Sequence, residues 1–334
     1  MHFTHFLLRS LASAAAVFHR GIGYTGRAER AIVASRQEET NTCTNPQKRV
    51  EWRTLDATTQ KQYTDAVLCL TTKPSQLGLN TTLYEDFVWV HAHLNEQIHF
   101  VAQFLPWHRY FVHLYETQLR NCGYDGIMAY WDWTVDVADP SKSAIWDPVR
   151  GFGGDGVGHH HFNGVDPILD ICVQDGPFAN MTLHYTRTEY SEHCLSRNFN
   201  NGLEFPGDML SFAYSPKTMA NIHSIPEYDW FRINLEGNPH GAVHSAINGD
   251  MGPSSSPNDP IFFLHHTQID RIWWLWQQDK PEHLQNYSGR KTQTESEDTM
   301  SSSLEDIMPF LGLADDLKLA EVMTTQSSIL CYEY

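Results

Sequence analysis

Apolar residues recur at helical spacing along much of this chain, which predicts a mainly α-helical protein. Between Val50 and Thr72, apolar and aromatic side chains return at spacings of three, four and eight. A second helix is expected from Leu83 to Leu94. A third is expected to begin near Pro106, because proline fits the first turn of a helix, and to continue to about Arg120.

The second half of the chain shows three further helical patterns. A short helix is expected from Ser215 to Ile222, and Pro239 is expected to open another. The clearest helix start is the run PNDP at 257–260, where Asn258 or Asp259 can cap and Pro260 occupies the first turn. The helix that follows is predicted to span 261–278.

Long polar segments separate these helices. Residues 131–201 are rich in Gly, Asp and Pro and predict a loop region, and 288–303 predict a polar linker. We expect a signal peptide at 1–25, a flexible arm or pro-segment at 26–42, one main domain at 43–287, and a linker with a C-terminal tail at 288–334. Few short strands are expected.

Composition narrows the class of partner. The chain has 334 residues, of which 41% are hydrophobic, so it can bury a large core. Its 40 acidic and 23 basic residues give a net charge of −17. This charge argues against nucleic acid and anionic membranes as partners and suits neutral or cationic small molecules. No stretch after the N-terminus approaches the roughly 20 apolar residues of a membrane span.

The cysteines bear on the cellular compartment. There are six, without a CxxC pair, which predicts up to three disulfides among fifteen possible pairings. An N-terminal apolar run and N-x-[ST] sites at Asn80, Asn180 and Asn286 add to the case for a secreted glycoprotein. The alternative is an intracellular protein with six free thiols.

Two triplets of histidine carry the candidate chemistry: His91, His99 and His108, then His240, His244 and His266. His240 and His244 are four residues apart, so they share one face of a helix. Six neutral imidazoles can bind two transition-metal ions, although imidazole alone does not select the metal. Zinc is the default for HxxxH, but the HExxH base of zinc proteases is missing.

Some neighbouring residues leave the assignment open or suggest supporting roles. His93 competes with His91 because VHAH offers both. Asp270, one turn after His266, is expected to accept the free ring N–H of that histidine, with Arg271 neutralising the acid. Glu116, two turns after His108, is expected to brace the helix bundle.

The motifs around the histidines resemble one family. WHRYF, the HxxxH pair and SPNDPIFFLHHTQIDRIW are similar to the tyrosinase and catechol oxidase family, which includes molluscan haemocyanin units. The resemblance covers roughly residues 45–280. It implies a four-helix bundle around a type-3 dicopper site with two copper ions as cofactors. Copper A would be bound by His91, His99 and His108, and copper B by His240, His244 and His266, the second histidine of its pair.

The sequence departs from the family at several positions. Gln97 stands where many tyrosinases have a cysteine that forms a thioether with a copper ligand. Gly241 follows the first copper B histidine, where strong monophenolases often have Asn, while Glu236 can still be the acid that orients a water. Ser245 replaces a residue that is often bulkier or charged. We also expect no C-terminal shielding domain.

The resemblance implies oxidation of o-diphenols to o-quinones by O2, with weak monophenol hydroxylation and o-aminophenol oxidation as further activities. Phe262 would be a ring over copper A that gates the site, the alternative being an ordinary core phenylalanine. Two other functions stay open: a secondary-metabolite tailoring oxidase that acts on a bulkier phenol, and an oxygen carrier of haemocyanin type. The sequence leaves the oligomeric state open.

Overall fold

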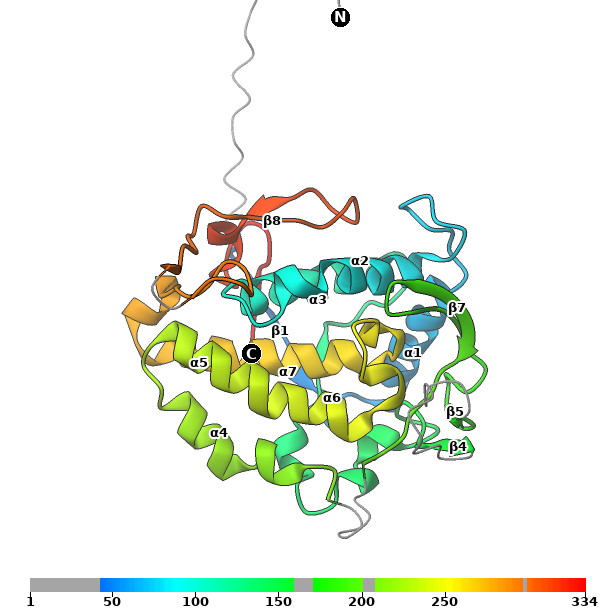
Figure 1. Ribbon diagram of the computed structural model, residues 1–334. Coiled ribbons are helices and arrows are strands. Elements are labelled where there is room, and N and C mark those ends of the chain that lie inside the picture. The colour runs from blue at the N-terminus through cyan, green and yellow to red at the C-terminus, as the bar shows by residue number, and fades with distance from the viewer. Residues whose placement is uncertain (1–42, 159–170, 201–207, 297–298) are drawn as a thin grey trace, which may run out of the picture. The chain divides into compact units, whose positions relative to one another are not determined.

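A computed structural model describes residues 43–158, 171–200, 208–296 and 299–334, and Figure 1 shows that helices dominate them. The predicted signal peptide and arm at 1–42 lie outside the described residues. The expected mainly helical fold is confirmed. The helices are α1 (Ala57–Leu70), α2 (Leu83–Ile98), α3 (Phe104–Asn121), α4 (Pro216–His223), α5 (Tyr228–Leu235), α6 (Gly241–Ile247) and α7 (Ile261–Asp279).

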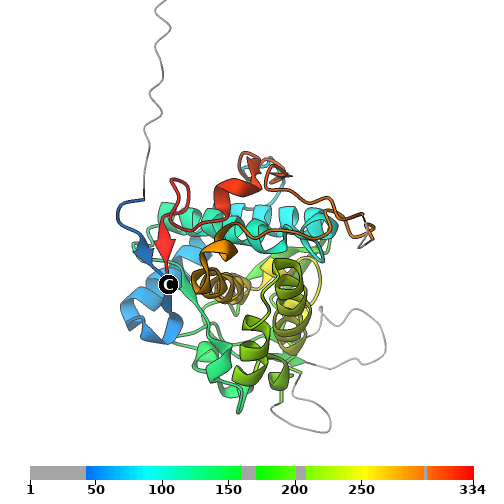
Figure 2. The same cartoon turned by 90° about the vertical axis from the view of Figure 1, so that its left-hand side faces the viewer.

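Buried faces and caps explain where the long helices form. Asp56 caps α1 by accepting the Thr59 N–H, and Thr82 caps α2 by accepting the Glu85 N–H. α7 is buried along nearly its whole length and packs on α3. In Figure 2 it is seen almost end-on, with α3 above it and α5 and α6 beside it. α7 is thus the central helix of the bundle.

The expectation that Pro239 opens a helix is wrong. Pro239 lies inside a π-helical turn, η7 (Glu236–His240), that joins α5 to α6 without a break. Proline lacks an N–H and clashes with the carbonyl four residues before it, and the wider π turn relieves both problems. The helix therefore begins at Tyr228, eleven residues earlier than predicted.

The strands are short and pair only in twos. They are β1 (Gln47–Lys48) with β10 (Tyr332–Glu333), β2 (Val50–Glu51) with β3 (Ala129–Tyr130), β4 (Gly156–Gly158) with β5 (Ile171–Val173), β6 (Thr182–Thr186) with β7 (Glu189–Cys194), and β8 (Ile307–Met308) with β9 (Leu317–Lys318). No pattern along the chain signals these strands strongly. They fasten the loops and both ends of the described domain to the helical core.

All six cysteines form disulfides, as the sequence allowed. The pairs are Cys43–Cys331, Cys69–Cys122 and Cys172–Cys194. Cys43–Cys331 joins residues 288 positions apart and lies beside the parallel pair β1 and β10. The C-terminal segment also packs on α3, where the Trp107 ring stacks on Phe310 at 5.3 Å. Among the helices described, none has the length and apolar character to cross a bilayer.

Candidate metal centre

Seven histidine side chains converge between α2, α3, η7, α6 and α7. The first cluster is His91, His99 and His108, and the second is His240, His244, His265 and His266. Within each cluster, one ring nitrogen of every member lies within 4.8 Å of those of the others. All six candidate histidines of the sequence therefore come together, and His265 joins them.

The first cluster is supplied by α2 and α3. His91 lies on α2, His99 ends that helix as its C-cap, and His108 lies on α3. Their ring centroids are 4.9 to 5.4 Å apart, and each side chain is buried. His93 is exposed and stacks on Trp89 at 3.9 Å, outside the cluster. Geometry thus favours His91 over His93.

The second cluster is supplied by the π turn, α6 and α7. The ring of His240 lies 4.5 Å from that of His244 and 5.0 Å from that of His266. The two clusters face each other through His108 and His266, whose rings stack at 4.4 Å. This arrangement leaves room for two binding positions side by side.

Backbone carbonyls fix the proton on five of these rings. The Nδ1–H groups donate to the carbonyls of Ser254, Asn95, Phe104, Glu236 and Met251, from His91, His99, His108, His240 and His244 respectively, over 2.7 to 3.2 Å. A carbonyl can only accept, so Nδ1 must carry the proton in each neutral ring. The Nε2 lone pair of each is then free to bind a metal.

Burial keeps the rings neutral. It lowers the pKa of His99 to about 3 and that of His244 to about 4. The pKa values of the remaining members also fall well below the ordinary value, first because of burial and then because of the neighbouring histidines. Neutral imidazole is the form that coordinates transition metals.

The residues fit a bound cation. His91 Nε2 lies 3.3 Å from His108 Nε2, although both rings hold their protons on Nδ1. Two lone pairs therefore face each other in a buried site, which is unfavourable unless a positive charge lies between them. The Nε2 atom of His240 is also buried with no protein partner. A metal ion in each cluster satisfies these atoms.

Glu236 is the first residue of the π turn that ends at His240 of the second cluster. Its Oε1 accepts the backbone N–H of Phe100 at 2.6 Å, and its Oε2 accepts from Arg232 at 2.7 Å. Burial raises the pKa of Glu236 to about 7, although Arg232 opposes the shift. The carboxyl group thus links α5 to the loop that carries His99.

Phe262 lies between the two clusters. Its ring is fully buried, stacks on His266 at 4.0 Å and meets His91 edge-on at 5.0 Å. Behind these histidines it contacts Phe111 and Phe263. The ring thus separates the histidines from the aromatic core.

The expectation that Asp270 supports His266 is wrong. The Asp270 carboxylate accepts from Arg109, Arg49, Tyr332 and Tyr334, while His266 Nδ1 has no partner. Two buried guanidinium groups attract the carboxylate more strongly than a neutral ring does. Arg271 is directed elsewhere, toward Asp132 and over the ring of Tyr130. Glu116 pairs with Arg120 on its own helix and with Arg49, which also reaches Asp270 on α7, so it links elements of the bundle as expected.

The five backbone acceptors and one tryptophan of the site were missed from sequence. The carbonyls of Ser254 and Met251 orient His91 and His244, and the indole of Trp133 contacts His265. Backbone acceptors carry no residue signature, so they could not have been found. Trp133 lies in the run YWDWTV, where it was one of ten tryptophans in the chain.

Comparisons with known proteins agree with this geometry. The family model for the common central domain of tyrosinase matches residues 81–279, which is more than half of the chain. The chain is 44% identical to the tyrosinase-like protein phomQ1' of Diaporthe leptostromiformis over 87% of this chain and 80% of the relative. It is 37% identical to tyrosinase ustQ of Aspergillus flavus, again over 87% and 80% of the two chains.

A solved structure is similar throughout the domain. A variant of the polyphenol oxidase from Thermothelomyces thermophila superposes with a TM-score of 0.73 and 28% identity, covering 86% of this chain and 88% of that one. The match therefore extends well beyond the histidine motifs to most of the described fold. Family model, relatives and fold agree, and the chain belongs to the tyrosinase family of oxidases.

Proposed function

We propose that this protein is a dicopper oxidase that converts o-diphenols into o-quinones with O2. The observation that carries the proposal is the pair of facing histidine clusters with five Nε2 lone pairs left free by backbone hydrogen bonds. The proposed ligands of one copper are His91, His99 and His108. Those of the other are His240, His244 and His266.

Copper suits this donor set better than the other common ions. All proposed ligands are imidazoles, which suit copper, whereas magnesium and calcium prefer oxygen ligands. The bound copper pair supplies the redox chemistry, so that two diphenols lose four electrons to one O2 and give two quinones and two waters. No cysteine is free to form a thioether with a ligand, since all six are in disulfides.

The chain's own residues position and protect the reaction. The five backbone acceptors hold the rings in place, and Phe262 orients His266 by stacking on it while it closes the site toward the core. Glu236 is the proposed acid near the second copper. Both of its oxygens already accept one hydrogen bond, and the remaining lone pairs can orient a water.

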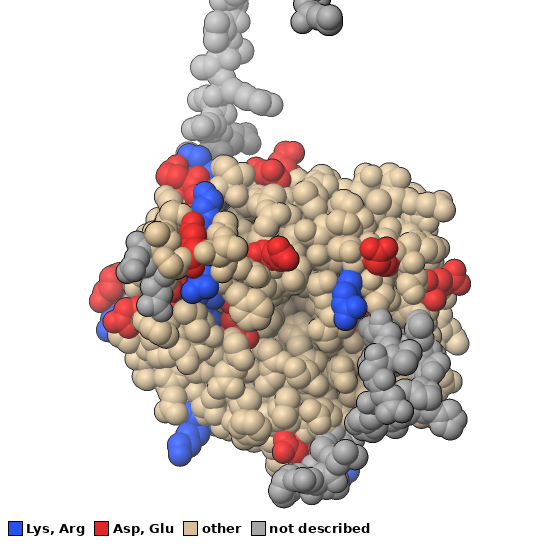
Figure 3. Space-filling view, in the orientation of Figure 1, with Lys and Arg blue, Asp and Glu red and all other residues tan. Residues whose placement is uncertain are grey.

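The surface supports a neutral aromatic substrate. α6 carries no charged residue, and the face over α5 and α6 shows few charged side chains in Figure 3. Large aromatic side chains are exposed at Phe100 and Trp230, by 60% and 56%. A neutral phenol or catechol can bind to such a surface without covering a charged side chain that it cannot pair with, and so avoids that desolvation cost.

Purified protein should contain two copper ions and consume O2 with catechol. His108→Asn should abolish O2 uptake and lose copper, whereas His93→Asn, outside both clusters, should retain both. A wild-type protein that holds two coppers and consumes no O2 with catechols, aminophenols or bulkier phenols would contradict the proposal. Reversible O2 binding without turnover would favour the carrier function instead.

We also propose that the protein is secreted. Its three disulfides are typical of oxidising compartments. Asn80 and Asn180 are exposed, so both can accept a glycan. Recovery of the native protein from culture medium, with a mass that falls on deglycosylation, tests this. Retention in the cytosol with reduced thiols would contradict it.

A further inference from the structure

The seventh histidine of the site, His265, differs from the others in its hydrogen bonding. It is fully buried, and its ring lies 5.4 Å from that of His240 and 5.0 Å from that of His244. Its Nδ1 faces a side chain and not a carbonyl: the indole Nε1 of Trp133 lies 3.2 Å away. Its Nε2 has no hydrogen-bond partner.

The chemistry of this contact determines where the proton of His265 lies. An indole N–H can only donate, so Nδ1 must accept with its lone pair and Nε2 must carry the proton. This is the reverse of the proton placement on the five rings that donate to carbonyls. A neutral imidazole has one ring lone pair, and in His265 the indole of Trp133 occupies it.

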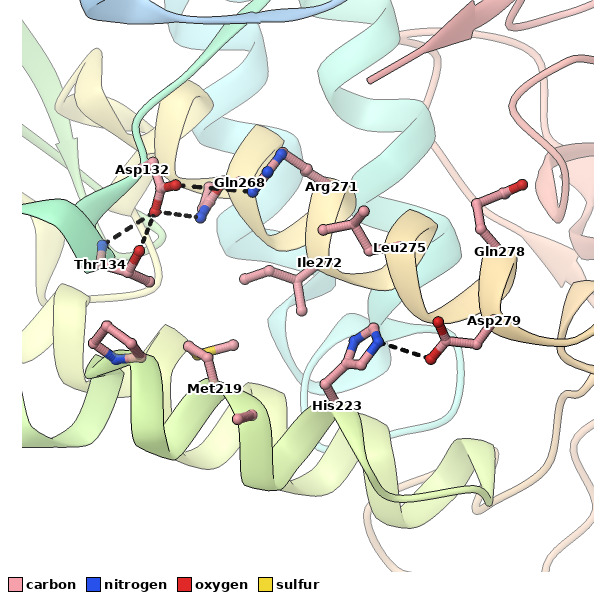
Figure 4. A pocket seen from close by; sticks show the side chains of 12 residues that line it. Asp132, Thr134, Met219, His223, Gln268, Arg271, Ile272, Leu275, Gln278 and Asp279 are labelled. Carbon is pink, nitrogen blue, oxygen red and sulfur yellow. Dashed lines mark hydrogen bonds and ion pairs between the residues drawn. The ribbon is translucent and has the colours of Figure 1, made fainter.

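The segment that carries Trp133 is held firmly on α7. Trp133 begins a 3-10 turn, η2 (Trp133–Val135), which Asp132 caps. Asp132 Oδ1 accepts from Thr134 and, at 3.0 Å, from Gln268 on α7, as Figure 4 shows. The N–H of Trp131 donates to the Leu264 carbonyl next to His265. Asp132, Thr134 and Gln268 line one end of a cavity of about 490 Å3 between α4 and α7. Their contacts, together with the Trp131 hydrogen bond, fix the indole against the ring.

We propose that Trp133 is a positioning residue that keeps His265 from binding metal, and so holds the second copper to three imidazoles. The inference rests on the proposed dicopper function. One nitrogen of His265 lies within 4.8 Å of those of His240, His244 and His266, close enough to compete for the same ion. Four imidazoles would close the coordination shell, whereas a catalytic metal needs an open position.

The proton placement can be tested without any metal. In apo-protein labelled with 15N-histidine, the signals lost in His265→Asn identify this ring. Long-range 1H–15N spectra should show its Nδ1 unprotonated, opposite to the proton placement in His91 or His108. A protonated Nδ1 in the wild type would overturn the proposal.

The metal test compares Trp133→Phe with Trp146→Phe. Both lose a buried indole N–H, but that of Trp146 donates to the Pro140 carbonyl, away from the histidines. In zinc-loaded Trp133→Phe, the freed lone pair of His265 should slow release of the second ion to a chelator about tenfold, the scale on which outer partners change metal affinity. Trp146→Phe should release zinc as the wild type does.

The double variant Trp133→Phe/His265→Asn should return to the wild-type release rate, which a merely structural role of Trp133 would not predict. His265→Asn alone should still bind two ions, and it does not depend on the folding of Trp133→Phe. Loss of an ion in His265→Asn, or unchanged release in Trp133→Phe, would overturn the proposal. Because zinc needs no turnover, these outcomes are independent of whether the copper protein oxidises phenols.

Discussion

The backbone N–H of Phe100 donates to Glu236 Oε1 over 2.6 Å, across 136 positions of sequence. Phe100 has a φ of 57°, a left-handed conformation that costs a non-glycine residue about 1 to 3 kcal/mol. Glu236 offsets this cost by fixing the peptide. The bond thus ties the loop after His99, in the first cluster, to the π turn that leads to His240, in the second.

Removal of this tie should destabilise the fold. Glu236→Ala leaves buried Arg232 with Asp229 as its only acid partner, so we expect the free energy of unfolding to fall by about 3 to 5 kcal/mol. Glu236→Gln retains an acceptor and should cost about half as much. Urea unfolding of the apo-proteins measures both, and equal losses for the two variants would show that the retained acceptor contributes nothing and that the negative charge alone stabilises Arg232.

Gly241→Asn should raise phenol hydroxylation relative to diphenol oxidation. A Cβ at Gly241 would meet only the Glu236 carbonyl, at 3.5 Å, so the helix accepts the side chain without strain. An amide beside His240 can help Glu236 to orient a water that deprotonates the phenol. We expect a gain of about tenfold in the ratio, below the roughly 100-fold of a complete general base.

A matched control exists in the same π turn. Gly237 is exposed, and a Cβ there would meet nothing within 4 Å. Gly237→Asn adds the same amide away from the histidines and should leave the ratio of tyramine to catechol turnover unchanged. If both variants, or neither, change the ratio, the position next to His240 is not what controls hydroxylation.

Asp270 should matter for stability more than for metal binding. Asp270→Ala removes the buried carboxylate that Arg49 and Arg109 share. We expect the free energy of unfolding to fall by about 3 to 5 kcal/mol. Tyr334→Phe removes one hydrogen bond to the carboxylate and should cost about 2 kcal/mol. Exposed Tyr190→Phe is the control. Loss of metal from a folded Asp270→Asn would instead restore the role predicted from sequence.

Stability should also depend on pH through His193. Burial alone lowers the pKa of His193, but the hydrogen bond to Asp250 at 2.9 Å and the negative charge of that carboxylate together outweigh burial and raise it. The ion pair is therefore fully stabilising below the unfolded value of about 6.5. Its contribution is lost as pH rises through the higher folded pKa. Urea unfolding between about pH 6 and pH 9 should show this decline, and His193→Gln should reduce it.

The histidine assignments came from motifs that encode local geometry, and local geometry was predictable. The HxxxH pair and the PNDP start depend on neighbours in sequence, and α7 begins at Ile261 as expected, although Pro260 is its N-cap and neither Asn258 nor Asp259 is. The partner of Asp270 was not predictable in this way. Arg49 and Tyr334 reach it from 221 and 64 positions away, and no periodicity records such contacts.

Pro239 shows a different limit of prediction from local sequence patterns. A proline after a glycine and an asparagine ordinarily marks a helix start, yet the buried face of α5 continues through it. Tertiary packing outweighs the local preference, and the chain adopts a π turn. His265, on α7, also lies in the second cluster, and spacing alone could not distinguish its role from that of His266.

The Cys43–Cys331 bond makes the described domain a covalent ring of chain. A single protease cut in an exposed stretch such as 291–294 would therefore release no fragment. The nicked protein would migrate as one species until a reductant is added, and the two pieces would stay close enough to remain folded around the histidines. Limited digestion followed by reducing and non-reducing gels would distinguish intact from nicked enzyme, and assays of activity alone would not.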